Sequence, residues 1–397
     1  MTVFTTDKFG ADEIATRAEY QEENKELAQE LGQGMSGKED YFQQPGGDTL
    51  LTEFVGSGAA ALGLGTTPQK GDYAALMSGE NPRTNEKYID QSRRKVVGFS
   101  TSFNVDKTIS LLYAAVPREQ QAIIERALME AARRTFEHAE KQGYFGYRLG
   151  AQGADRYAGK ALAANYLHFT NRNQEPHLHV HTEIPNACMM PNGEWMALDG
   201  AEIYKRQAEF AALFDCYLAH ALGREIPQLA KHLESDLEHH GLRVAGISRE
   251  TILAFSTRRI EVLQGLDKMG SSGASAARGV AKNSRATKKQ VDTNKLRAEW
   301  RQDLENLHKE LKTGDLTPET RLFAEQLVFR NASVFGEHAL DRAAAQLAIL
   351  HGGEPAIPAI KAGLIRQLGV IELPQEGRHR EFTTETYRQL EAELLAY

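Results

Sequence analysis

The segment that most constrains the fold of this 397-residue chain is YLHFTNRNQEPHLHVH, which runs from Tyr166 to His181. His179 and His181 are separated by one apolar residue, so both side chains lie on one face if the segment is a β-strand. In a hairpin, His168 on the preceding strand would complete a three-nitrogen metal site. Three protein ligands leave coordination positions open for water or substrate, as a catalytic metal requires. The spacing H-x10-H-x-H therefore predicts a β-hairpin that carries a catalytic metal site.

The residues alone leave other interpretations of these histidines open. Histidines at alternate positions also occur in ordinary strands as polar residues that bind nothing. His177 shares the strand parity of His179 and His181 and could be a fourth ligand, but it follows Pro176. We expect His177 at the start of the strand, facing solvent or DNA. No cluster of cysteines accompanies the histidines, which argues against a structural zinc site.

Length and composition limit the class of protein. A chain of 397 residues is long enough for two or three domains. The net charge of -7 gives no overall sign of a nucleic-acid partner. Cys188 and Cys216 cannot form a disulfide framework, which favours a reducing compartment. The sequence shows neither a signal peptide nor an apolar run of membrane-spanning length, so we expect a soluble cytoplasmic protein without membrane insertion.

Hydrophobic spacing and turn residues predict an α+β fold. We expect residues 1–47 to be polar and helix-prone, residues 94–116 to change from strand to helix after Asp106, and residues 117–142 to form a long helix. Strands are expected at 144–150, 161–171 and 177–190, followed by a hairpin turn at PNGEW. Further helices are expected at 201–222 and 226–240. This order indicates a central antiparallel β-sheet with flanking helices and places the histidines on its middle hairpin.

The composition changes near Gly270. Residues 270–295 are rich in glycine, serine, alanine and basic residues, and they include Arg285, Lys288 and Lys289. One interpretation is a solvated linker, and the other is a mobile arm that neutralises DNA phosphates. Residues 301–397 are predicted to be mostly helical, with a small β-hairpin and a last helix in a winged-helix-like arrangement.

The segment HFTNRNQEPHLHVHTEIPNACMMPNGEWMALD resembles the histidine motif of the HUH endonucleases, and within them the MobF class of conjugative relaxases. The likeness covers most of residues 1–300. It includes GFSTSFNVDKTISLL, FVGSGAAALGLG, TILAFSTRRIEVLQGL and NSRATKKQ. The resemblance implies a relaxase domain over residues 1–300 and, over residues 301–397, the start of a helicase part. The chain has no G-x4-G-K-[ST] phosphate loop, so we expect it to be the N-terminal part of a longer protein.

The resemblance implies nicking of one DNA strand at a plasmid transfer origin, which starts conjugative transfer. A tyrosine hydroxyl attacks the scissile phosphodiester and forms a reversible 5′-phosphotyrosyl link, while a divalent metal on the three histidines neutralises developing charge. Members of the class work with Mg2+ or Mn2+, although three imidazoles also suit Zn2+ or Ni2+. The implied partners are single-stranded origin DNA with an adjacent hairpin, accessory transfer proteins and a type IV secretion coupling protein. The implied location is the bacterial cytoplasm, followed by transfer to the recipient cell with the DNA.

The nucleophiles of the class are tyrosines near the N-terminus, usually in two pairs. Here single residues stand in their places, Tyr20 in IATRAEYQ and Tyr41 in KEDYFQQ. The resemblance assigns the first cleavage to Tyr20. Tyr41 is the candidate for a second strand transfer, or for the first cleavage in place of Tyr20. Either tyrosine could instead pack on a helix face.

One position departs from the pattern of the class. Where members carry an acidic residue that hydrogen-bonds a metal-binding histidine, this chain has Ser100, which cannot supply a negative charge or act as a base near neutral pH. Glu183 has the strand parity to offer a carboxylate instead. The basic residues expected to contact DNA are Arg172, Lys107, Arg258, Arg259, Arg285, Lys288 and Lys289.

Three alternatives differ from this hypothesis in class or in target. An HUH rolling-circle replication initiator would use the same chemistry at a replication origin. An origin-binding protein that does not cut would bind DNA without its histidines. A three-histidine metal hydrolase would act on a small molecule in a closed apolar pocket and would give Tyr20 no role.

Overall fold

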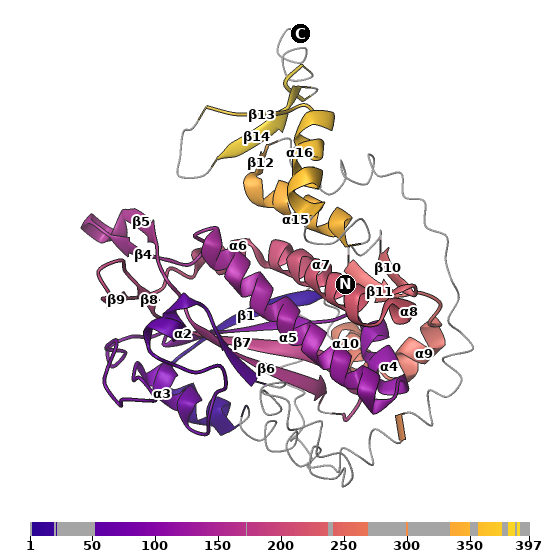
Figure 1. Ribbon diagram of the computed structural model, residues 1–397, viewed down its shortest axis with the longest axis horizontal. Coiled ribbons are helices and arrows are strands. Elements are labelled where there is room, and N and C mark those ends of the chain that lie inside the picture. Colours follow the sequence, from indigo (N-terminus) through magenta and orange to yellow (C-terminus); the bar gives the residue numbers. More distant parts are fainter. Residues whose placement is uncertain are drawn as a thin grey trace.

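The centre of the molecule is an antiparallel β-sheet. The computed structural model describes residues 2–19, 21, 52–171, 173–236, 241–268, 299–300, 334–349, 356–374, 380–385 and 387–389. Within these residues the sheet has five strands in the order β1-β3-β7-β6-β2, and each neighbouring pair is antiparallel (Figure 1). The strands are β1 Val3–Phe9, β2 Thr52–Val55, β3 Gly98–Asn104, β6 Ala163–Thr170 and β7 Pro176–Pro185. The histidine strand β7 is therefore the middle strand, and hydrogen bonds hold it on both edges.

One face of this sheet packs against the main helices. These helices are α4 Lys107–Ala115, α5 Arg118–Lys141 and α7 Gln207–Glu225 (Figure 1). Leu178 and Val180 of β7 and Leu167 of β6 point into this main core. The carboxylate of Asp106 accepts a 3.0 Å hydrogen bond from the amide of Thr108 and caps α4. The expected strand-to-helix junction at Asp106 and the expected long helix α5 are both confirmed.

The opposite face carries a second, smaller core. Side chains alternate across a strand, so Ala164 and Tyr166 of β6 face this core while Leu167 faces the main one. The smaller core is covered by the helical residues 14–19 and 21 together with α2 Ser57–Ala61 and α3 Asp72–Ser78. Gly98 lies where β3 meets β1, and a Cβ atom there would lie 2.6 Å from the ring of Phe9. The sheet is thus covered on both faces, and the expected α+β fold with a central antiparallel sheet and flanking helices is confirmed.

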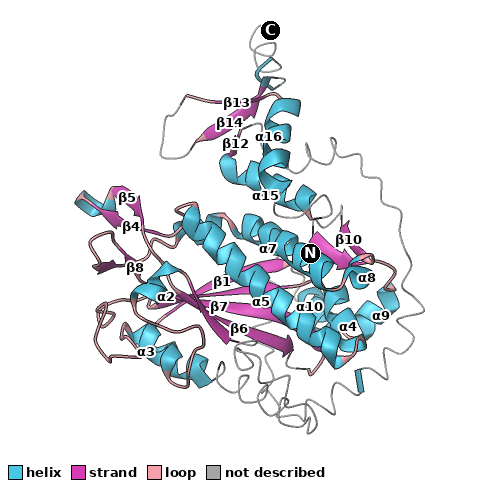
Figure 2. Cartoon of the chain, viewed as in Figure 1, coloured by secondary structure: helices cyan, strands magenta, loops and turns pink. Residues whose placement is uncertain are grey.

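Shorter elements surround this centre (Figure 2). Two-stranded ribbons are formed by β4 Gly146–Leu149 with β5 Asp155–Ala158 and by β8 Cys188–Met189 with β9 Trp195–Met196. The second ribbon confirms the hairpin turn expected at PNGEW. The other elements are 3-10 helices Ala11–Glu13 and Ala151–Gly153, α6 Ala201–Lys205, α8 Pro227–Ala230, β10 Leu233–Asp236, β11 Gly241–Val244, α9 Arg249–Ala254 and α10 Thr257–Lys268.

Two expectations about secondary structure were wrong. The N-terminal segment begins with strand β1, not with a helix, because its threonines and phenylalanines suit a pleated surface and it pairs along its whole length with β3. The helix expected at 226–240 is limited to α8, after which β10 pairs with β11. Leu242 and Val244 of β11 are fully buried in the main core. Pairing between strands and burial outweigh the local helix preference there.

The C-terminal region has helices and a small sheet. Its elements are β12 Phe335–Gly336, α15 Glu337–Ala348, α16 Ile357–Gln367, β13 Val370–Glu372 and β14 Glu381–Thr384. The three strands form a sheet in the order β12-β14-β13, and α15 packs on α7. The proposed division near residue 300 stays a prediction, and the whole basic segment 270–295 lies outside the described residues. No described helix is long and apolar enough to cross a bilayer.

Candidate metal centre

The structure brings the three histidines expected to share a metal onto one face of the sheet. His168 of β6 lies directly opposite His179 of β7, and Tyr166 lies opposite His181. The ring centroids are 5.1 Å apart for His168 and His179, 4.7 Å for His168 and His181, and 5.0 Å for His179 and His181. One ring nitrogen from each lies within 4.8 Å of the other two. A divalent ion about 2.0–2.2 Å from each nitrogen suits this donor set, with small side-chain rotations.

The orientation of His179 is fixed by the backbone of β7. Its Nδ1 lies 2.8 Å from the carbonyl oxygen of His177. Because a carbonyl can only accept, Nδ1 carries the proton and Nε2 keeps the lone pair that a metal needs. His168 and His179 are buried. These two imidazoles are therefore shielded from water on the side of the sheet that faces the smaller core.

His177 lies at the start of β7, as the sequence suggested. Its ring is next to that of His179, with 4.6 Å between centroids, but it does not belong to the three-nitrogen group found among the described residues. Burial, together with the neighbouring His179 and Lys107, lowers the pKa of His177 well below its ordinary value. The contribution of His177 to the site is therefore its backbone carbonyl, which accepts the hydrogen bond from Nδ1 of His179.

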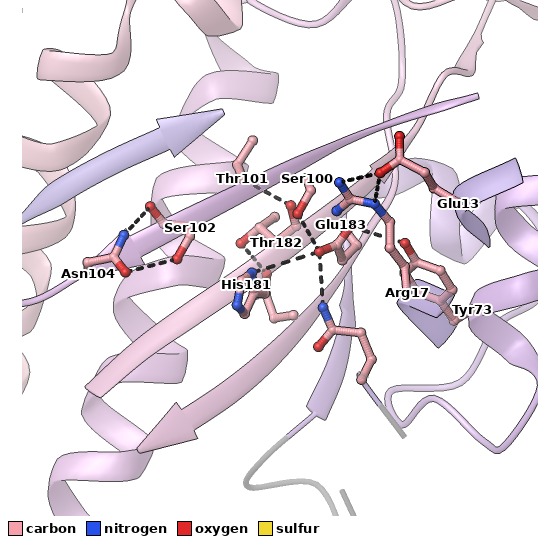
Figure 3. Close-up of polar contacts among 12 residues, drawn as sticks. Glu13, Arg17, Tyr73, Ser100, Thr101, Ser102, Asn104, His181, Thr182 and Glu183 are labelled. Atoms are coloured by element: carbon pink, nitrogen blue, oxygen red, sulfur yellow. Dashed lines mark hydrogen bonds and ion pairs between the residues drawn. The ribbon is translucent and has the colours of Figure 1, made fainter. Parts of the chain in front are cut away.

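A carboxylate lies beside the histidines on the same face (Figure 3). Glu183 is directly opposite Ser100 in the pairing of β7 with β3, and the Ser100 hydroxyl donates a 2.7 Å hydrogen bond to Oε1 of Glu183. The same oxygen lies 3.9 Å from Nδ1 of His181. Burial raises the pKa of Glu183 to about 7, against the hydrogen bonds from Ser100, Tyr73 and Gln21, which lower it. A carboxyl group is therefore present, but it comes from β7 and not from β3.

Sequence reasoning missed two neighbours of this carboxylate. The amide Nε2 of Gln21 donates to Oε1 of Glu183 at 3.1 Å, and the Tyr73 hydroxyl lies 3.4 Å from Oε2. Tyr73 is 2% exposed, and burial and the charge of Glu183 raise the pKa of its phenol, so it is a poor nucleophile. No sequence pattern singles out Tyr73. Gln21 could have been noticed because it directly follows Tyr20.

The residues expected to contact DNA are only partly described. The ammonium group of Lys107 donates a 2.6 Å hydrogen bond to the carbonyl of Pro176, and burial lowers its pKa to about 8. Helix α10 carries Arg258 and Arg259, and its first amide, that of Thr257, donates to the carboxylate of Glu175 at 2.7 Å. Several residues singled out from the sequence have side chains that lie outside the described part of the structure: Tyr20, Tyr41, Arg172, Arg258, Arg259, Arg285, Lys288 and Lys289. Their roles stay predictions.

Comparison with known proteins places these features in context. The model of the TrwC relaxase family matches residues 14–307. The multifunctional conjugation protein TraI of Escherichia coli K12 is 25% identical over 301 residues, which are 70% of this chain and 16% of TraI. The chain therefore spans about a sixth of the length of this relative.

Solved structures match over a longer part of the chain. The copper-bound structure of the conjugative relaxase TrwC in complex with oriT DNA has a TM-score of 0.62 and 25% identity, and the match covers 78% of this chain and 100% of that one. TrwC in complex with a 27-mer DNA comprising the recognition hairpin and the cleavage site has a TM-score of 0.61 and 23% identity, with the same coverage, and shows the shared fold.

Proposed function

The chain belongs to the TrwC relaxase family, and we propose that it nicks one strand of DNA at a plasmid transfer origin to start conjugative transfer. The observation that carries this proposal is the placement of His168, His179 and His181 on one buried face of the central hairpin, within a family match that covers most of the chain. We further propose that its substrate is single-stranded origin DNA with an adjacent hairpin. The similar relaxase TrwC forms complexes with oriT DNA and with a 27-mer that comprises the recognition hairpin and the cleavage site, and this supports the choice.

The proposed reaction is a transesterification. The phenolic oxygen of a tyrosine, Tyr20 for the first cleavage, bonds to the scissile phosphorus as its proton leaves. The bond from phosphorus to the 3′ oxygen breaks, and that oxygen takes up a proton to give a free 3′-OH. One phosphodiester replaces another, so the step needs no oxidant or nucleotide cofactor and can run backward to rejoin the strand. Tyr41 is proposed for a second transfer of the same kind.

The residues of the site have separate tasks in this proposal. A divalent ion held by His168, His179 and His181 would supply positive charge beside the non-bridging oxygens of the phosphate. His179 is held by the His177 carbonyl in the tautomer that leaves Nε2 available. We propose Mg2+ or Mn2+ in the cell, whereas the imidazole donors also suit Zn2+, Ni2+ or copper, the ion in one TrwC structure.

Further roles complete the proposal. Arg172, Lys107, Arg258, Arg259, Arg285, Lys288 and Lys289 are proposed to hold DNA phosphates. Accessory transfer proteins and a type IV secretion coupling protein are proposed as partners, with the protein acting in the bacterial cytoplasm before it enters the recipient cell with the DNA. A replication initiator with the same chemistry is the second candidate, and the matches to conjugation proteins favour transfer.

The test is capture of a covalent protein–DNA adduct. The protein is incubated with a randomised pool of single-stranded DNA and Mn2+, and adducts that survive denaturing detergent are sequenced and mapped by mass spectrometry. We expect one enriched sequence joined to Tyr20, with adducts lost in Tyr20→Phe. A matched control is Tyr157→Phe, which alters a tyrosine that is 47% exposed on β5.

The outcomes separate the candidates. Full adduct formation by Tyr20→Phe would contradict the assignment of the nucleophile, and mapping to Tyr41 would exchange the two roles. Selective binding without any adduct would support an origin-binding protein that does not cut. Absence of both binding and adducts would exclude a relaxase.

A further inference from the structure

We infer that Glu183 is a positioning residue. By binding Gln21, it holds the helical residues 14–19 and 21 against the face of the sheet that carries the histidines. The inference rests on the proposed function, because it assigns that segment the nucleophile Tyr20. It adds a contact between the N-terminal helical segment and Glu183, whose Oε1 lies 3.9 Å from Nδ1 of His181.

The carboxylate of Glu183 is the point where separate elements meet. Gln21 of the N-terminal helical segment donates to it at 3.1 Å, Ser100 of β3 donates at 2.7 Å, and the hydroxyl of Tyr73 of α3 lies at 3.4 Å. These donors come from positions far apart in the sequence. A carboxylate has two oxygens with about four lone-pair sites for donors, whereas a serine hydroxyl has one oxygen with two. Glu183 therefore joins the N-terminal segment, β3 and α3 to the strand that holds His181.

The N-terminal segment presents one face to this part of the molecule. Residues 14–19 and 21 are helical, and Ile14, Ala18 and Gln21 recur at the spacing of one helix face. Ile14 and Ala18 pack in the smaller core, which supplies the apolar part of the contact. Gln21 lies at the end of the same face and supplies its polar contact, the hydrogen bond to Glu183. The contact with Glu183 thus sets how far along the sheet the segment lies.

Burial makes the hydrogen bond between Gln21 and Glu183 hard to replace. Gln21 is 2% exposed and Glu183 is 1% exposed, so water has little access to replace a lost hydrogen bond. Among the described residues the other amide atom of Gln21, Oε1, has no hydrogen-bond partner, so the amide is held through Nε2. Tyr20 is joined to Gln21 by one peptide bond. Loss of this contact would loosen the placement of the tyrosine, and small errors of placement slow reactions strongly.

The test compares variants that separate docking from charge. Gln21→Met removes the donor and keeps the length of the side chain. Glu183→Ala removes the acceptor, whereas Glu183→Gln keeps an oxygen for Gln21 and Ser100 and turns an amide toward the Tyr73 oxygen, which can accept. The control is Gln121→Met on α5, because Gln121 is equally buried and its Nε2 donates to the Tyr113 carbonyl at 2.9 Å, away from the histidines.

Two measurements are made on each variant. The first is the single-turnover rate of adduct formation with the selected oligonucleotide, beside its dissociation constant from fluorescence anisotropy. The second is amide hydrogen exchange in the peptide that contains residues 14–21, which does not depend on activity. For Gln21→Met and Glu183→Ala we expect adduct formation to slow by roughly 10- to 100-fold and exchange of that peptide to rise by a similar factor. DNA affinity should change by less than about threefold, and Glu183→Gln should recover most of both losses.

The outcomes distinguish this inference from the proposed function. If the wild-type protein forms adducts and Gln21→Met matches Gln121→Met in rate and exchange, docking through Glu183 is wrong while the relaxase function stands. Equal loss in Glu183→Gln and Glu183→Ala, with Gln21→Met silent, would also overturn docking and assign Glu183 a role through its charge. If the wild-type protein forms no adducts with any DNA, the proposed function fails and the inferred role in nicking fails with it.

Discussion

The two faces of strand β7 differ in what their side chains do. On one face Leu178, Val180 and Ile184 pack into the main core beneath α4 and α5. On the other face His179 and His181 alternate with them and meet His168. A single strand therefore serves stability with one set of side chains and chemistry with the other. A shift of one residue in its pairing would exchange the two faces, so the pairing of β7 with β3 and β6 is a condition for the site.

Buried polar groups are used differently on the two sides. On the side of the main core, Glu209 accepts a 2.8 Å hydrogen bond from the Tyr144 hydroxyl and pairs with Arg206 at 2.8 Å, which joins helices and loops. On the histidine side, three imidazoles and the carboxyl group of Glu183 are gathered, with one carboxyl oxygen 3.9 Å from Nδ1 of His181. Grouping polar side chains in this way opposes folding unless a ligand compensates. The histidine face thus lowers the stability of the folded state for the sake of function, and the apolar packing on the other face offsets that loss.

The largest effect expected from this comparison follows from His181→Ala. Loss of one imidazole leaves two ligands, so affinity for Mn2+ should fall and adduct formation should slow by roughly 100-fold or more. Because His181 is not part of the main core, the midpoint of thermal unfolding without metal should change little. Calorimetric titration with Mn2+, the rate of adduct formation and a thermal melt provide the measurements. An adduct rate equal to that of the wild type, with metal affinity retained, would show that the ligands lie elsewhere.

The neighbouring residue should show the reverse behaviour. Val180 is fully buried in the main core, and Val180→Ala removes two methyl groups and leaves a cavity. We expect the free energy of unfolding to fall by about 2–3 kcal/mol. The adduct rate per folded molecule should stay within about twofold of the wild type. Urea unfolding and active-site titration measure the two quantities, and a large loss of rate in the folded fraction would show that the two faces are coupled.

The sequence predicted the parts of this arrangement that depend on local pattern. The spacing of His168, His179 and His181 implied a hairpin, and strand parity pointed to Glu183 as a possible carboxylate near them. It could not reveal that Tyr73 and Gln21 converge on Glu183, because such contacts depend on how separate elements pack. The same limit explains β10, where pairing with a later strand replaced an expected helix. Local periodicity describes one element at a time, whereas the site is made by several.

The smallest expected effect concerns a carboxyl group on the packing side. Asp215 of α7 accepts hydrogen bonds from the Thr2 hydroxyl and, at 3.1 Å, from the Leu242 amide, and burial raises its pKa from 3.8 to about 6. The folded state then holds this proton more tightly than the unfolded state. The contribution to stability is complete below pH 3.8 and is lost as pH rises through about 6.

Asp215→Asn removes this titration, so the variant serves as the reference for the wild type. The free energy of unfolding of the wild type minus that of Asp215→Asn should fall by about 1.5 kcal/mol between about pH 4 and pH 5.5. Urea unfolding at several pH values measures this difference, and titrations elsewhere in the chain cancel in it. A difference that rises with pH would mean that the ionised carboxylate is favoured in the folded state. The adduct rate should be the same for both proteins, because Asp215 lies on α7 and hydrogen-bonds to Thr2 and Leu242 on the packing side.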